Sequence, residues 1–193
     1  MHRYLVALAG GLALSACNTD PNPAATPEGG PDAAETAAQT ELPPPMPEEL
    51  SETTPQQFVE KVAASDLYEL EAAKLAEKNG KSAATKESAA MMIKDHTASS
   101  KKLMDAASKA TPTITAKPTL TSEQQAQIDA LRGAGPEFDK RYAEQQAAAH
   151  DKALALLKTY SASGTDASLK SFATEVAPTV QPHAEKAKAL PGT

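Results

Sequence analysis

Residues 82–111 read SAATKESAAMMIKDHTASSKKLMDAASKAT. Apolar and small side chains recur there at intervals of three and four, which predicts one helix with a single buried face. Ser82 is typical of a helix start, and Thr111-Pro112 predicts its end. The buried stripe comprises Ala89, Met92, Ile93, His96, Ser100, Leu103 and Ala107. A histidine, His96, therefore lies on the face that we expect to be buried.

The same spacing predicts helices on both sides of this stretch. One runs from about Pro55 to a stop at Asn79-Gly80, with Val59, Val62, Asp66, Glu69, Ala73 and Ala76 as its stripe. A short helix starts at Thr121 or Ser122 and breaks at residues 133–136. A long helix follows to about residue 161, and the last begins at Asp166. Prolines 178 and 182 should kink or interrupt that last helix.

The predicted fold is all-α. No stretch alternates β-branched and polar residues, so strands are not expected. Four long helices, mostly joined by short turns, predict an antiparallel four-helix bundle over residues 55–190 with up-down-up-down order. Alanine at many interior positions would let the helices approach one another closely.

The N-terminus predicts export and lipid attachment. Residues 1–16 have a short basic start and an apolar run of about 12 residues, which fits a secretory signal and is too short to span a bilayer. Leu14-Ser15-Ala16-Cys17 resembles the bacterial lipobox, and Cys17 is the only thiol in the chain. We expect Cys17 to carry the lipid, with the protein facing the periplasm. Asn18 favours the outer membrane over the inner one.

Residues 17–54 are rich in proline, alanine and glutamate. They contain too few large apolar residues to offset the entropy of ordering, so they predict a disordered tether.

Composition excludes several classes of function. The net charge of −6 argues against nucleic-acid binding. One cysteine excludes a disulfide framework and any multi-cysteine metal site. No Gly-x-Ser-x-Gly elbow and no glycine-rich phosphate loop occurs, so no catalytic motif indicates an enzyme.

Ionisable residues fall on the apolar stripe of each long helix: Glu69, His96, His150 and His183. Measured along the helices from turns at one end of the bundle, Glu69 and His150 would lie about 17 Å deep, His96 about 22 Å and His183 about 25 Å. These depths permit one site. Neutral imidazoles would bind a transition metal such as zinc, iron or copper, with Glu69, Asp95 or Asp139 supplying charge.

The alternative is a polar network that fixes helix register without any metal. A di-iron centre of the usual kind requires Glu-x-x-His on two helices, and positions 93, 147 and 180 are Ile, Ala and Val. Ferroxidase-type chemistry is therefore not indicated.

Several short runs resemble the bacterial family called "domain of unknown function 4142", which is predicted to be ferritin-like. The most specific are Asp95-His96-Thr97 and Phe138-Asp139-x-x-Tyr142, and the rest are Phe58-Val59, Glu69, Met92-Ile93-Lys94, His150, Phe172-Ala173 and His183. The resemblance implies an exported four-helix bundle, often a lipoprotein. It implies recurrent positions at Glu69, Asp95, His96, Asp139, Tyr142, His150 and His183, and it supplies no activity.

Three functions remain open from the sequence, and the least favoured is an oxidoreductase or hydrolase of ferritin-like descent. Of the remaining two, one is an envelope lipoprotein that holds a metal in its bundle. The other is a structural or interaction module whose helices meet an envelope protein partner, with the inward polar residues only fixing the fold.

Overall fold

The computed structural model describes residues 53–191. The predicted signal at 1–16 and nearly all of the predicted tether at 17–54, with Cys17, lie outside this range. The helical elements are α2 (Pro55–Asn79), α3 (Ala83–Ser108), α4 (Ser122–Arg132), the 3-10 turn η1 (Gly135–Glu137), α5 (Phe138–Ser163) and α6 (Ala167–Lys188). No strand occurs between residues 53 and 191. The all-α prediction is confirmed, and the likeness to ferritin stays a prediction.

Side-chain caps explain where the helices begin. Thr54, Ser82 and Thr121 each accept a hydrogen bond from the backbone N–H three residues later, at the starts of α2, α3 and α4. Asp166 accepts from the N–H groups of Ser168 and Leu169 at the start of α6. Such caps satisfy donors that a helix leaves unpaired at its first turn.

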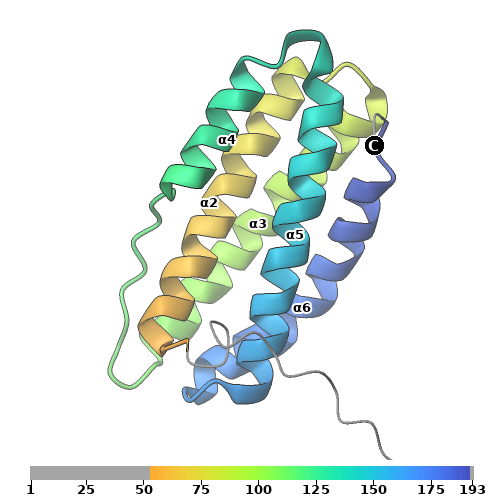
Figure 1. The fold of residues 1–193 in the computed structure, drawn as a ribbon. Helices are drawn as coiled ribbons and strands as arrows, with labels where there is room; N and C mark the ends of the chain where they lie inside the picture. The colour runs from red at the N-terminus through yellow and green to blue at the C-terminus, as the bar shows by residue number, and fades with distance from the viewer. Residues whose placement is uncertain (1–52, 192–193) are drawn as a thin grey trace, which may run out of the picture. The chain divides into compact units, whose positions relative to one another are not determined.

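The four long helices pack side by side around a common core (Figure 1). α2 packs against α3 and α5, and α6 also packs against α3 and α5. α4 lies outside this group and contacts α2 and α5. Each long helix thus has one face toward the other three, which is where their stripes are buried.

The order of the helices differs from the expected up-down-up-down arrangement. The N–H groups of Lys81 and Ser82 donate to Asp139, so the start of α5 lies beside the α2–α3 turn. At the other end, the N–H of Thr111 donates to Asp166, between α5 and α6. Residues 109–137 therefore return along the length of the domain, and α3 and α5 run in the same direction (Figure 1). The two short turns lie at opposite ends of the domain. The depths expected for the ionisable residues assumed turns at one end and were therefore wrong.

Both prolines of α6 are accommodated within the helix. The sequence predicts a kink or interruption at Pro178 and Pro182, and of these the interruption does not occur, because α6 continues from Ala167 to Lys188. Each proline lacks the N–H that would bond four residues back.

Polar residues divide the core into two apolar parts. One cluster gathers around Phe58, Leu103, Tyr160 and Phe172, and the other gathers around Tyr68, Met92, Ile128 and Tyr142. Between them along every long helix lies what we call the polar layer: Asp66, Glu69, His96, Gln146, His150 and His183, each at most 6 % exposed. The interior of the fold is therefore polar at mid-height.

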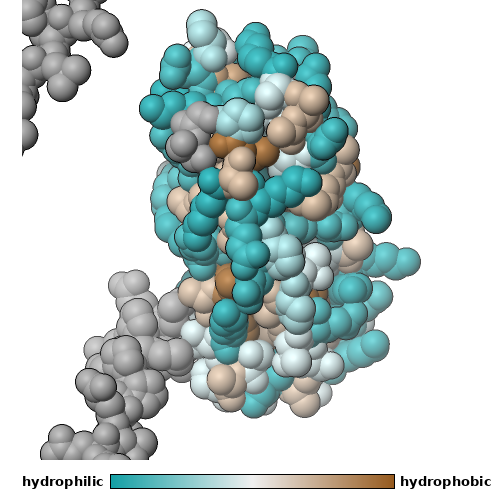
Figure 2. Space-filling model, turned by 90° about the vertical axis from the view of Figure 1, so that its right-hand side faces the viewer, coloured by the Kyte–Doolittle hydropathy of each residue, from teal (hydrophilic) through white to brown (hydrophobic). Residues whose placement is uncertain are grey.

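The surface formed by residues 53–191 exposes few large hydrophobic side chains. On the face shown in Figure 2, hydrophobic residues occupy only small areas among polar ones. Met104 is the one large apolar side chain exposed among the described residues. None of the helices within residues 53–191 combines the length and apolar character needed to cross a membrane.

Candidate metal centre

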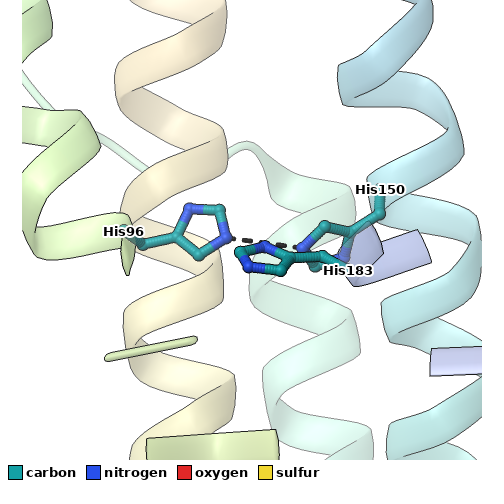
Figure 3. Close-up of side chains that lie close together, drawn as sticks. All are labelled: His96, His150 and His183. Carbon is teal, nitrogen blue, oxygen red and sulfur yellow. Dashed lines mark hydrogen bonds between the residues drawn. The ribbon is translucent and has the colours of Figure 1, made fainter. Parts of the chain in front are cut away.

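Three histidines from three helices meet in the polar layer. His96 comes from α3, His150 from α5 and His183 from α6, and their rings turn toward one another (Figure 3). One nitrogen of each lies within 4.8 Å of the others' nitrogens. His96 Nε2 lies 3.4 Å from His150 Nε2. We call these three residues the histidine triad.

Each ring is held through its other nitrogen by a separate acceptor. His96 Nδ1–H donates to Asp66 Oδ1 at 2.8 Å. His150 Nδ1–H donates to the carbonyl oxygen of Gln146 at 2.8 Å, one turn back on α5. His183 Nε2–H donates to Asp95 Oδ2 at 3.0 Å.

These bonds fix which nitrogen carries the lone pair. A carbonyl or carboxylate oxygen only accepts, so the nitrogen facing it carries the hydrogen. In the neutral rings this leaves His96 Nε2, His150 Nε2 and His183 Nδ1 free to bind a metal. Acceptors of this kind behind the ligating histidines are a regular feature of metal sites.

Burial favours neutral rings at two of the three positions. It lowers the pKa of His150 to about 3, with a further contribution from the charge of His96. It also lowers the pKa of His183, although the hydrogen bond to Asp95 works in the opposite direction. His150 and His183 are therefore unprotonated at neutral pH, as ligation requires.

His96 behaves differently from the other two. Burial lowers its pKa, but the hydrogen bond to Asp66 and the negative charge of Glu69 outweigh burial and leave the pKa above its ordinary value. Ser100 donates to the second oxygen of Asp66 at 3.1 Å, which orients this carboxylate. The Asp66–His96 pair thus favours a proton or another positive charge at His96 Nε2.

Glu69 lies beside the triad rather than within it. Its Oε1 is 3.8 Å from His150 Nδ1, so it faces the side of the ring opposite the free Nε2. Burial raises the pKa of this carboxyl to about 7, against an opposing contribution from the charge of His96. Its Oε2 has no hydrogen-bond partner among the described residues.

The remaining predicted site residues have different positions. Asp95 contacts the triad directly through His183. Asp139 binds two backbone N–H groups at the end of the domain. Tyr142 is buried two turns before His150 on α5, and burial together with the charge of Glu69 raises the pKa of its hydroxyl.

Sequence reasoning placed Asp66 on a buried stripe but did not include it among the site residues. The sequence did indicate that Asp66 lies near the site, because Asp66 shares one face of α2 with Glu69, three residues later. The carbonyl of Gln146 carried no signal, since any residue four positions before His150 offers the same backbone oxygen.

Comparisons with known proteins identify the family. Residues 39–190 match the family described as domain of unknown function (DUF4142). Neither the curated proteins nor the solved structures contain a match to the chain. Because residues 39–190 make up most of its 193 residues, the chain belongs to the DUF4142 family.

Proposed function

We propose that this protein binds one transition-metal ion in its helical domain, with His96 Nε2, His150 Nε2 and His183 Nδ1 as the ligands. The observation that carries the proposal is His183 Nδ1, which is buried and has no hydrogen-bond partner among the described residues. A buried polar atom without a partner is destabilising. A metal ion shared with the other two nitrogens would satisfy it.

The geometry of the free nitrogens supports the same proposal. Two nitrogens bound to one tetrahedral ion at about 2.0–2.1 Å lie about 3.3–3.4 Å apart. His96 Nε2 and His150 Nε2 are 3.4 Å apart already. These two rings would therefore need little rearrangement to share an ion, and a nitrogen of His183 lies within 4.8 Å of both.

The donor set narrows the choice of metal. Imidazole suits zinc, iron and copper, whereas calcium and magnesium prefer oxygen ligands. Asp66 and Asp95 lie behind two of the rings, so they would place negative charge near a divalent ion while leaving its direct ligands neutral. We propose zinc, iron or copper on these grounds, and we propose no reaction catalysed by the chain.

The proposed metal binding would take place in the bacterial envelope. The support comes from the N-terminal sequence alone, where Leu14-Ser15-Ala16-Cys17 resembles a lipobox. Lipid on Cys17 would anchor the protein to a membrane facing the periplasm, with the outer membrane favoured. There the helical domain would buffer or sense the metal.

The test measures metal content and thermal stability. The full-length chain carries Cys17→Ser, which removes the only thiol, so that any bound metal reports on the histidines. After chelation, the protein is exposed separately to zinc, iron and copper, and excess metal is removed. We expect one ion per chain and a higher melting temperature with one of these metals.

The competing function is a structural or interaction module with an envelope protein as partner. In that case protonated His96 would bridge Asp66 and His150, because both contacts already have hydrogen-bond length. No stoichiometric metal together with an unchanged melting temperature would overturn the metal proposal and favour this alternative.

A further inference from the structure

A cavity of about 150 Å³ adjoins the histidine triad. All four long helices contribute to it. His96 and His183 form part of its wall, and Ala153 lies one turn beyond His150 on α5. The cavity therefore adjoins the place where a metal ion would sit. The proposed metal site does not require this space for its three ligands.

The wall of the cavity has two chemically different parts. Val62, Leu156, Leu157, Val176 and Val180 make one part apolar, and all five are buried. The other part carries His96 and His183 of the triad together with the carboxylates of Asp66 and Asp95. A molecule that fits both parts has an apolar body and one polar end.

The entrance to the cavity lies where exposed residues form part of its lining. Ala98, Lys102 and Thr179 belong to its lining and are exposed. Lys102 forms an ion pair with Glu175 at 2.8 Å, and both side chains are about half exposed. The cavity thus communicates with solvent between α3 and α6.

The charge near the proposed metal site determines which polar group the bound molecule carries. Three neutral imidazoles leave the charge of a divalent ion uncompensated among its direct ligands. Such an ion favours an anion as a further ligand. Without the ion, Asp66 and Asp95 would repel an anion at the same place. Anion binding in this cavity must therefore depend on the metal.

We propose that the cavity binds a small organic monocarboxylate whose carboxylate binds the metal ion and whose apolar body lies against Leu156, Val176 and Val180. This inference rests on the proposed metal site. A carboxylate oxygen forms a bond to the ion, and a water molecule leaves it, with no change of oxidation state. A cavity of about 150 Å³ accommodates a body of the size of benzene, so benzoate is the appropriate probe.

The test uses the full-length Cys17→Ser chain loaded with Co²⁺, which absorbs visible light when bound by few ligands. Benzoate is titrated while the cobalt bands are recorded, and acetate serves as the matched anion without a large apolar body. We expect a saturable change in the bands, with benzoate binding at least tenfold more tightly than acetate.

Each other result overturns a defined part of the proposal. If no cobalt bands form, both the metal site and the ligand are overturned. If the bands form but benzoate leaves them unchanged, only the ligand is overturned. If acetate and benzoate bind equally well, the apolar wall has no role and the inference fails.

Variants of the cavity wall provide an independent test. Ala98→Phe enlarges an exposed side chain at the entrance and leaves the core intact. Val176→Phe fills the cavity from its buried wall. Both should weaken benzoate binding at least tenfold while the cobalt bands persist. Ala155→Phe, at an exposed alanine of α5 that does not line the cavity, should leave benzoate binding unchanged. Unchanged benzoate affinity in folded Ala98→Phe and Val176→Phe proteins would overturn the assignment.

Discussion

His96 Nε2 and His150 Nε2 lie 3.4 Å apart, and each ring carries a hydrogen on its opposite nitrogen. Two lone pairs at this distance repel unless a positive charge lies between them. The charge is either a proton on His96 or a metal ion shared by both rings. A proton and a metal therefore compete for the same place, and the predictions below separate their effects.

Metal affinity should fall as the pH falls. The pKa of His96 lies above its ordinary value, because its bond to Asp66 outweighs the effect of burial. A metal must displace the proton from His96 Nε2, so affinity should decrease about tenfold per pH unit below that pKa. Competition with a chelator between pH 5 and 7.5 measures this slope. An affinity that does not change with pH would contradict the proposed ligand set.

Removing any imidazole of the triad should abolish stabilisation by metal. At free metal one hundredfold above its dissociation constant, the wild type gains about 2.7 kcal/mol. His96→Ala, His150→Ala and His183→Ala should each lose this gain. Thermal unfolding is compared with and without metal within each variant, so that loss of packing cancels. Gln181→Ala, exposed on α6 near His183, serves as the control and should retain the gain.

Asp66→Asn should weaken metal binding without removing a ligand. Asparagine keeps an acceptor oxygen for His96 Nδ1–H but lacks the negative charge. Loss of such a partner typically lowers metal affinity about 10–100-fold. Asp105→Asn, at an exposed position on the same helix as His96, is the matched control. Equal affinities in the two variants would show that Asp66 does not tune the site.

Glu69→Gln should change how stability depends on pH in the metal-free protein. Burial raises the pKa of this carboxyl from an ordinary value near 4.5 to about 7. Between these values the folded state holds the proton and the unfolded chain releases it, so rising pH destabilises the wild type. The advantage of Glu69→Gln should therefore grow by about 3 kcal/mol between pH 4.5 and 8.

Denaturant unfolding at several pH values measures this difference. Glu87→Gln, at an exposed glutamate of α3, should follow the wild type throughout. A constant difference between Glu69→Gln and the wild type would mean that folding does not raise the pKa of Glu69.

Asp139→Ala should destabilise the fold and leave metal binding intact. The carboxylate accepts from the N–H groups of Lys81 and Ser82, each at 2.8 Å, where α3 begins. Loss of these bonds should lower the free energy of unfolding by about 1–2 kcal/mol. Chemical denaturation measures the loss, and metal titration measures the affinity. A weakened metal affinity would instead link Asp139 to the triad.

The helix limits could be predicted from the sequence because they depend on local chemistry. Thr54, Ser82 and Asp166 each bind the first turn that follows them, and no distant residue is needed. The family resemblance was likewise readable from short runs, and the match over residues 39–190 confirms it.

The arrangement of the site could not be predicted in the same way. Whether α5 runs with α3 or against it depends on the path of residues 109–137, and their sequence does not specify that path. The nitrogen that each histidine presents depends on its rotamer and on acceptors from other helices, such as Asp66 for His96 and Asp95 for His183. Periodicity indicates a face of a helix, not a nitrogen atom.

The two prolines of α6 affect how that helix moves. Without N–H groups at Pro178 and Pro182, the carbonyls of Thr174 and Pro178 lack their usual partners within the helix. Transient opening of this segment breaks fewer bonds than opening of an uninterrupted helix, so its amide hydrogens should exchange with solvent sooner. His183 follows directly after Pro182, and each opening would carry it away from His96 and His150. A bound metal ion would hold His183 to His96 and His150 and so slow hydrogen exchange along α6. The mobility of this helix would then depend on whether the ion is bound.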